Sequence, residues 1–230
     1  MSTAILIPAR YGSTRFPGKP LTMLGDQHMI VRVYNACKKS GLDTYVLTDH
    51  PLIIDLFPDT RIIVDTDPYE NGTERCAGAV NKSALLSHYD RFINVQGDMP
   101  DVTIEMIQKT EKMLDYYKVS TVCALMPEEE QNNPNSVKLV RAGDKCLWFG
   151  RGMTGYGDWH LGVYGYHKDV LQLYPYLTGT REERVEKLEQ LRWLKNGHDI
   201  GVLPVTFNGI EINTPEDAEK WNESNNGRST

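Results

Sequence analysis

The sequence lacks the features that mark several large classes of protein. No apolar run reaches the roughly eighteen residues of a membrane-spanning helix, and the N-terminus has no basic region followed by an apolar core, as a signal peptide would. The four cysteines show neither a C-x-x-C pair nor metal-ligand spacing, which is typical of reduced, buried cysteines. The net charge of −6 at pH 7 argues against a nucleic-acid-binding surface. We therefore expect a cytoplasmic protein with no membrane or nucleic-acid partner.

Several catalytic signatures are also missing. The chain has no G-x-S-x-G segment, no Ser-His-Asp grouping and no zinc-like cluster of histidine and cysteine. Its N-terminal loop falls short of a Walker A motif, G-x-x-x-x-G-K-[ST], because Gly12 and Gly18 are one residue too far apart. Pro20 also replaces the hydroxyl residue that would follow the lysine and hold magnesium. The chain is therefore not expected to be a P-loop NTPase.

What the N-terminus does carry is a pattern typical of phosphate binding. The apolar run 3–8 predicts a buried strand, and it leads at once into a Gly- and Pro-containing loop with the cations Arg10, Arg15 and Lys19. Cations, glycines and hydroxyls at the carboxyl end of a strand fit a polyphosphate better than a neutral ligand. A solvated basic turn is the alternative, but a surface turn rarely needs this many glycines and cations. The residues expected to hold a nucleotide here are Arg10, Gly12, Ser13 and Lys19.

Short apolar runs alternate with helical segments through the first half of the chain. This alternation predicts a mostly parallel sheet with right-handed crossovers, and ligands bind such sheets beyond the carboxyl ends of the strands. The expected strands are 3–8, 44–48, 61–64 and 91–95, and the expected helices are 28–40, 51–57, 73–87 and 102–117.

The second half of the chain is richer in strands. With 230 residues, no repeat and no long linker, we predict a single Rossmann-like α/β domain over residues 1–222 and a frayed polar tail at 223–230. The expected strands of this half are 120–125, 136–141, 145–149 and 160–166, followed by helices 181–196 and 215–225 with a strand near 200–205 between them.

The segment Gln96-Gly97-Asp98 follows the apolar run 92–95 and contains the best candidate metal ligand. Magnesium takes one or two protein carboxylates together with phosphate oxygens and water, so Asp98 fits such a site. A lone aspartate after a strand is more often a helix cap or a turn residue. The local pattern alone therefore leaves both interpretations open.

Six short blocks follow the N-terminal loop: N-G-T-E-R at 71–75, N-V-Q-G-D at 94–98, N-P-N-S-V-K at 133–138, H-L-G-V-Y-G-Y at 160–166, L-E-Q-L-R at 188–192 and N-T-P-E-D at 213–217. Together with the loop, and in this order, they resemble the sugar-acid cytidylyltransferases, specifically the 3-deoxy-manno-octulosonate cytidylyltransferase family. The resemblance extends from residue 3 to about residue 221.

The resemblance implies a nucleotide-diphospho-sugar transferase-like fold and a homodimer built partly by residues 120–166. It implies transfer of CMP from CTP to a 3-deoxy-2-ulosonic acid with Mg²⁺ and release of pyrophosphate. Catalysis is thereby assigned to Arg10, Lys19 and Asp98. Further nucleotide contacts are implied for Asn71, Gly72, Thr73, Arg75 and Gln96, and sugar contacts for Gln96, Arg151, His160, Tyr164, Glu189 and Gln190.

Without the resemblance, several of these residues have simpler interpretations. Thr73 fits the N-cap of a helix, and His160 fits a structural histidine in an apolar strand. Glu189 and Gln190 fit the solvated face of the amphipathic helix 181–196. The apolar side of that helix is expected to carry Val185, Leu188, Leu191 and Leu194.

The chain departs from the family pattern at position 213. The family has a second metal-binding aspartate there, whereas this chain has Asn213, whose amide oxygen carries no charge. Magnesium is therefore expected to bind chiefly to Asp98 and more weakly to Asn213. Asp217 is an alternative ligand, but its place in the first turn of a predicted helix favours a role at the helix dipole. The alternative functions are a CMP-nonulosonate (sialic-type) synthetase and a catalytically weak nucleotide- or sugar-acid-binding protein.

Overall fold

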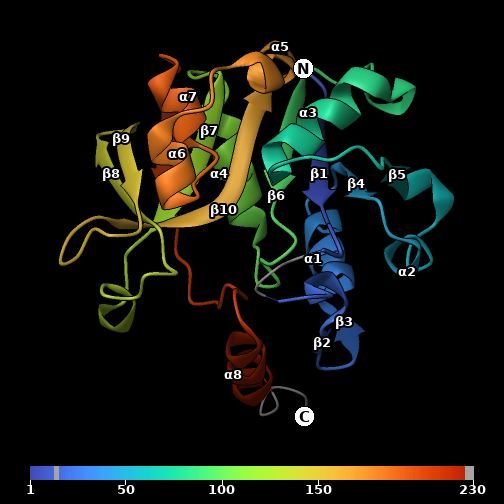
Figure 1. The fold of residues 1–230 in the computed structure, drawn as a ribbon, viewed down its shortest axis with the longest axis horizontal. Helices are drawn as coiled ribbons and strands as arrows, with labels where there is room; N and C mark the ends of the chain where they lie inside the picture. Colours follow the sequence, from blue (N-terminus) through green and yellow to red (C-terminus); the bar gives the residue numbers. More distant parts are fainter. Residues whose placement is uncertain (13–15, 226–230) are drawn as a thin grey trace.

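The computed structural model describes residues 1–12 and 16–225. Within these residues, nine strands form one central sheet with helices on both faces (Figure 1). Across the sheet the strands are ordered β5 (Ile62–Val64), β4 (Asp43–Thr48), β1 (Thr3–Pro8), β6 (Arg91–Val95), β10 (Asp158–His167), β7 (Val119–Ala124), β11 (Ile200–Pro204), β9 (Lys145–Gly150) and β8 (Lys138–Ala142).

The sheet is mixed rather than mostly parallel. The neighbours β5, β4, β1 and β6 run parallel, as the alternation of strands and helices predicts, and so do β7 and β11. In contrast, β10 runs antiparallel to β6 and β7, and β8 and β9 form an antiparallel hairpin. The reason is that no α-helix lies in the described residues between β7 and β10, so this part of the chain lacks the helical crossover that usually joins parallel strands, and a short turn joins β8 to β9. The α/β class and the β-rich second half are confirmed.

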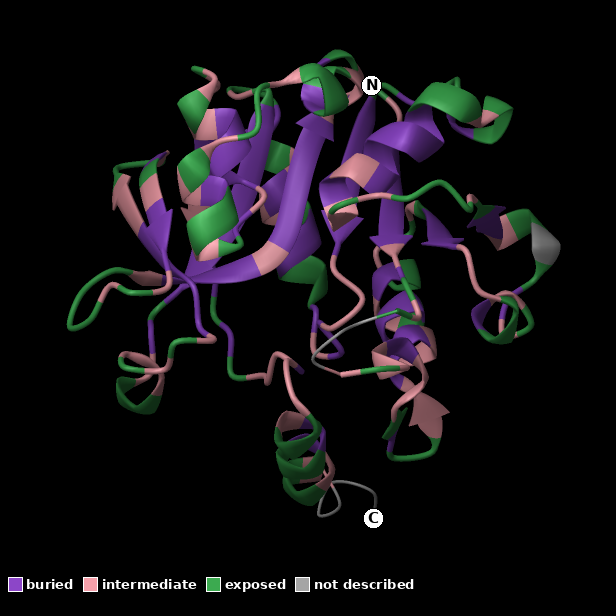
Figure 2. Ribbon diagram, viewed as in Figure 1, coloured by how far each residue is buried: buried purple, intermediate pink, exposed green. Residues whose placement is uncertain are grey.

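Alternating strand side chains build a core on each face of the sheet. Ile5 and Ile7 of β1 pack on the face covered by α1 (Met29–Lys38) and α4 (Ile104–Met113). Leu6 packs on the opposite face with α3 (Gly72–Lys82), α5 (Lys168–Leu173) and α7 (Leu191–Lys195). Figure 2 shows the central strands buried along most of their length, so a ligand can reach the sheet only at the strand ends. The remaining α-helices of the described residues are α2 (Pro51–Ile54), α6 (Arg181–Glu186) and α8 (Pro215–Asn225).

The helix α8 lies away from the sheet, beside β2 (Met23–Leu24) and β3 (Gln27–His28) (Figure 1). Trp221 of α8 packs with Leu24 and Ile212, and its indole N–H donates to Asp101 Oδ1 at 2.9 Å. These contacts hold the segment between β11 and α8 beside the residues that follow β6.

The single helix predicted over 181–196 is wrong. Lys187 adopts a left-handed conformation (φ 55°), which ends α6 and separates it from α7. The predicted apolar side is divided as a result, because Val185 is 71% exposed whereas Leu188 and Leu191 are buried. The turn between the two helices carries Glu189 toward α3, where one continuous helix would have left it on the surface.

The other predicted boundaries differ by a few residues, and α8 coincides with the predicted helix 215–225. Residues 223–225 therefore belong to a helix rather than to the predicted tail, and 226–230 lie outside the described residues. No helix in the described part of the chain is both long and apolar enough to cross a membrane.

Candidate active site

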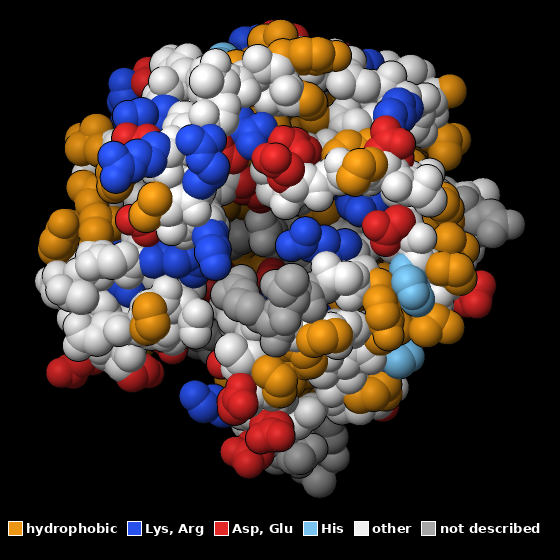
Figure 3. All heavy atoms as spheres, in the orientation of Figure 1, with side chains coloured by type: hydrophobic (Ala, Val, Ile, Leu, Met, Phe, Trp, Pro, Cys, Tyr) orange, Lys and Arg blue, Asp and Glu red, His pale blue; other side chains and the backbone are white. Residues whose placement is uncertain are grey.

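A cavity of about 560 Å³ opens at the carboxyl ends of β1 and β6, within the size range of small-molecule sites. Residues 8–10, at the end of β1, and 96–98, which follow β6, line it together. Because β1 and β6 are parallel neighbours, the two loops emerge at the same edge of the sheet, as the sequence predicts. Figure 3 shows Lys and Arg side chains around the hollow of this face, which suits an anionic ligand. The basic residues that line the cavity are Arg10, Lys19, Arg75, Arg151, Arg184 and Lys187.

Lys19 and Asp98 form an ion pair in this cavity. The Lys19 ammonium donates to Asp98 Oδ2 at 2.6 Å, and both side chains are mostly shielded from water. The turn before Lys19 requires glycine, since Gly18 has φ 68° and its N–H donates to Tyr11 O at 3.1 Å. Arg10, exposed at the end of β1, lines the same cavity. The predicted catalytic residues Arg10, Lys19 and Asp98 are therefore brought together.

The N-terminus of α3 forms another part of the wall. Asn71 is the N-cap, because its Oδ1 accepts the N–H of Glu74 at 2.9 Å. Arg75 lines the cavity while its guanidinium donates to Asp49 Oδ2 at 2.8 Å and to Asp65 O at 3.0 Å. The predicted nucleotide residues Asn71, Gly72, Arg75 and Gln96 all line the cavity.

Thr73 is not the N-cap of α3, so that prediction is wrong, and it does not line the cavity. With Asn71 as the cap, Thr73 falls inside α3 and faces the sheet, fully buried, with its Oγ1 3.1 Å from the Tyr166 hydroxyl. Its backbone N–H is also occupied, since it donates to Glu189 Oε2 at 2.9 Å. Of the other predicted nucleotide residues, Gly12 is exposed and does not line the cavity, and Ser13 lies outside the described residues.

Glu189 lies at the junction of three elements. Its Oε1 accepts the Gln96 side-chain N–H at 2.9 Å, and its Oε2 accepts the Thr73 N–H at the start of α3. Withdrawal of this carboxyl from water raises its pKa to about 7. Although Glu189 lines the cavity, both of its oxygens are used to hold the wall together.

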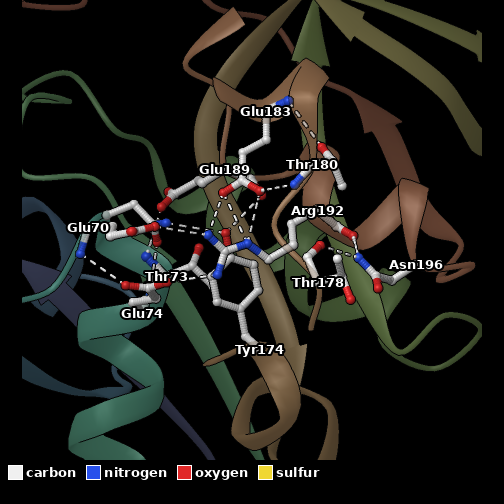
Figure 4. Close-up of polar contacts among 11 residues, drawn as sticks. Glu70, Thr73, Glu74, Tyr174, Thr178, Thr180, Glu183, Glu189, Arg192 and Asn196 are labelled. Atoms are coloured by element: carbon white, nitrogen blue, oxygen red, sulfur yellow. Dashed lines mark hydrogen bonds and ion pairs between the residues drawn. The ribbon is translucent and has the colours of Figure 1, made fainter. Parts of the chain in front are cut away.

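The contacts in Figure 4 keep Glu189 in place. The Arg192 guanidinium donates to Glu183 Oε1 at 2.7 Å and to Glu74 Oε1 at 2.7 Å, which joins α6 and α7 to α3. It also stacks on Tyr174, 4.5 Å from the ring centre, and the Tyr174 hydroxyl donates to Glu189 O at 3.0 Å. The network therefore places the 188–190 turn against the N-terminus of α3.

We expect Glu189 to make the folded protein less stable as the pH rises. Its pKa in the folded protein, about 7, lies above its ordinary value of 4.5. Its contribution to the free energy of unfolding is therefore fully present below about pH 4.5 and is lost as the pH rises through 7. The loss amounts to about 3–4 kcal/mol, because one pKa unit corresponds to about 1.4 kcal/mol. In urea unfolding at pH 5, Glu189→Gln should be less stable than the parent, because its amide offers one acceptor oxygen to the two donors, the Thr73 N–H and the Gln96 side chain. Between pH 5 and pH 8 the free energy of unfolding should fall less in this variant than in the parent. The exposed Glu182→Gln serves as the control, and an unchanged pH slope in Glu189→Gln would contradict this account.

The opposite wall of the cavity comes from the β-rich half. Arg151, at the end of β9, is held by Glu186, whose main-chain oxygen accepts its Nε–H at 3.1 Å. His160 Nε2 lies 3.2 Å from Thr121 Oγ1, and burial beside Arg151 lowers the pKa of His160 to about 3, so its ring is neutral. The predicted sugar residues Gln96, Arg151, His160, Tyr164, Glu189 and Gln190 all line the cavity.

Gln190 gives this wall an unused hydrogen-bond donor. The side chain is 2% exposed and lines the cavity, and its Nε2 has no hydrogen-bond partner among the described residues. Because a buried donor without a partner costs about 1–3 kcal/mol, this amide is suited to a polar ligand.

Glu211 is a cavity residue that no sequence motif indicated. Burial together with the nearby charge of Asp98 raises the pKa of its carboxyl to about 8. The only signal in the sequence is an acidic residue two positions before Asn213, and nothing local shows that it faces the cavity.

The oxygen donors in this part of the cavity fit magnesium. Asp98 and Glu211 supply carboxylates and Asn213 an amide oxygen, and Mg²⁺ prefers such ligands together with phosphate oxygens and water. Asp217 is not among them, because its Oδ2 accepts the N–H groups of Asn213 and Thr214 at 2.9 and 2.8 Å. Its predicted role in the first turn of the helix is confirmed.

A basic loop after β1, an acidic residue after β6 and a polar wall from the β-rich half define an α/β nucleotidyltransferase. The sequence model of the cytidylyltransferase family matches residues 4–200. The chain is 38% identical to the 3-deoxy-manno-octulosonate cytidylyltransferase of Fusobacterium nucleatum, over 94% of this chain and 93% of that protein. It is 37% identical to the 8-amino-3,8-dideoxy-manno-octulosonate cytidylyltransferase of Shewanella piezotolerans, over 94% and 96%. The chain belongs to the 3-deoxy-manno-octulosonate cytidylyltransferase family.

Solved structures agree with this placement. The structure of CMP:2-keto-3-deoxy-manno-octonic acid synthetase in complex with CTP matches with a TM-score of 0.88 and 31% identity, over 99% of this chain and 100% of that chain. The inositol-1-phosphate CTP transferase from T. maritima matches with a TM-score of 0.68 at 13% identity, over 99% of this chain and 97% of that one, which shows the shared fold alone.

Proposed function

We propose that this chain transfers CMP from CTP to the anomeric hydroxyl of a 3-deoxy-2-ulosonic acid, namely 3-deoxy-manno-octulosonate or a close analogue, and releases pyrophosphate. The observation that carries the proposal is that one cavity holds two sets of residues. Arg10, Lys19 and Asp98 line one part of it, and Arg151 and Gln190 line another wall. The relatives named for octulosonate and for its 8-amino analogue support this substrate class.

In the proposed reaction the protein positions the two substrates and neutralises charge. Arg10 and Lys19 bind the triphosphate, and Lys19 exchanges its bond to Asp98 for phosphate oxygens. Asp98 and Asn213 would hold magnesium, which supplies further positive charge at the phosphates. Arg151 attracts the sugar carboxylate, and neutral His160 offers a hydrogen bond without a competing charge. The sugar hydroxyl is thereby oriented to attack the α-phosphate in line with the departing pyrophosphate.

A pyrophosphate-release assay tests this function. CTP, ATP, UTP and GTP would each be combined with 3-deoxy-manno-octulosonate, its 8-amino analogue and a nonulosonate. We expect release with CTP and an octulosonate. Release with the nonulosonate alone would indicate a sialic-type synthetase, and no release with any pair would leave a binding protein as the better interpretation.

We also infer that the enzyme acts as a homodimer in the cytoplasm. Large exposed apolar side chains in the β-rich half and near α6 support a self-interface, including Leu125, Leu147, Tyr156, Tyr176 and Val185. All four cysteines are buried and unpaired, as is usual in a reducing compartment.

The dimer predicts a particular mass in solution. The chain has a mass of 26.1 kDa, so light scattering at working concentration should return about twice this value. A mass near that of one chain would contradict the dimer and leave the proposed reaction unaffected.

A further inference from the structure

We propose that Glu211 is a metal-binding residue of this site. Asp98 supplies one carboxylate to the cation, and Glu211 supplies the second one in place of the aspartate that the family has at position 213. This inference rests on the proposed function, because it concerns the cation that accompanies the nucleotide. The Glu211 carboxylate, two residues earlier in the chain, then compensates for the weaker magnesium binding expected from Asn213.

The backbone places Glu211 and Asn213 on the same side of their segment. Ile212, between them, donates its N–H to Asp98 O at 3.1 Å and buries its side chain fully against Leu24 and Trp221. Glu211 and Asn213, on either side of this buried side chain, are both half-buried. Both Glu211 and Asn213 line the cavity, as Asp98 does.

The loop after β6 is also joined to β10. The Gly162 carbonyl accepts the Gln96 N–H at 3.0 Å, and Gly162 leaves room for this contact, because a Cβ there would lie 3.2 Å from Gln96 Cγ. Gly162 and Glu211 both line the cavity with Asp98, so the loop that carries Asp98 is held in place before a cation binds.

The charges of the site favour a cation at this place. Asp98 is paired with Lys19. A triphosphate bound by Lys19 would leave the Asp98 carboxylate without this partner and would be repelled by it. A divalent cation between the carboxylate and phosphate oxygens turns this repulsion into attraction, and magnesium prefers such oxygens.

The test is direct measurement of metal binding, with Mn²⁺ as the probe. Free Mn²⁺ would be followed by electron paramagnetic resonance in the presence of enzyme and CTP. We expect Glu211→Gln to weaken Mn²⁺ binding at least tenfold. Adding Asn213→Asp to this variant should restore most of the affinity, because a carboxylate returns to the same side of the segment. Glu216→Gln, which removes an exposed carboxylate in the first turn of α8, is the matched control and should bind like the parent.

Each other outcome is decisive. Unchanged Mn²⁺ affinity in folded Glu211→Gln would overturn the inference while leaving the proposed reaction in place. So would an increase in the KM for the sugar with unchanged metal affinity, because Glu211 would then act through Arg151. No Mn²⁺ binding by the parent with CTP would overturn the metal site as a whole. If Glu211→Gln does not fold, Glu211→Asp keeps the charge but shortens its reach, and it should still weaken Mn²⁺ binding measurably.

Discussion

Asp98→Asn is expected to lower turnover by about 100-fold or more. The aspartate is the carboxylate that follows β6, and it both pairs with Lys19 and faces the cavity. Removing a unit charge about 4 Å from a cation weakens their attraction by about 1 kcal/mol in water and by several times more where water is excluded. A loss of about 3–4 kcal/mol of transition-state stabilisation corresponds to about 100- to 1000-fold in rate. Pyrophosphate release at saturating CTP and ulosonic acid would measure it.

A second arm of this experiment varies the magnesium concentration. Asp98→Asn should regain part of its rate at high magnesium, because the remaining ligands still contribute. The control is Asp26→Asn, which removes an exposed carboxylate whose partner, Arg32, lies outside the cavity. A folded Asp98→Asn enzyme with the parent's rate and magnesium dependence would show that Asp98 does not hold the metal.

The second large effect is expected at Lys19. Lys19→Ala should lower turnover by about 30- to 1000-fold, because a charge-assisted contact to the transition state is worth about 2–4 kcal/mol. The folded structure should survive the change, since the Lys19 side chain lines the cavity rather than the hydrophobic core. Steady-state turnover and urea unfolding of the same preparation would separate the two effects.

Lys195→Ala is the matched control for this substitution. Lys195 donates to Glu182 at 2.8 Å on the surface, where an ion pair contributes about 1 kcal/mol at most. Its turnover should equal that of the parent. Unchanged turnover in folded Lys19→Ala would remove the loop after β1 from the mechanism.

The core of the candidate site could be predicted from the sequence. Lys19 and Asp98 are far apart in the chain, yet each follows an apolar run that forms a strand of a parallel sheet. Parallel strands end at the same edge of a sheet, so a local pattern was enough to bring the two side chains into one cavity. The family resemblance also implied Arg151 and His160, which the structure places on the cavity wall.

What the sequence by itself determined are the features that depend on near neighbours: the strand runs, most helix spans, the glycine turn before Lys19 and the place of Asp217 in the first turn of α8. Only the tertiary structure decided the direction of β10, the break at Lys187, the burial of Thr73 and the arrival of Glu211 in the cavity. Each of these depends on contacts between distant segments, as when Ile212 packs against α8 while its neighbour Glu211 lines the cavity. Periodicity and spacing describe one element at a time, whereas the packing of one element on another selects which side chains face the ligand.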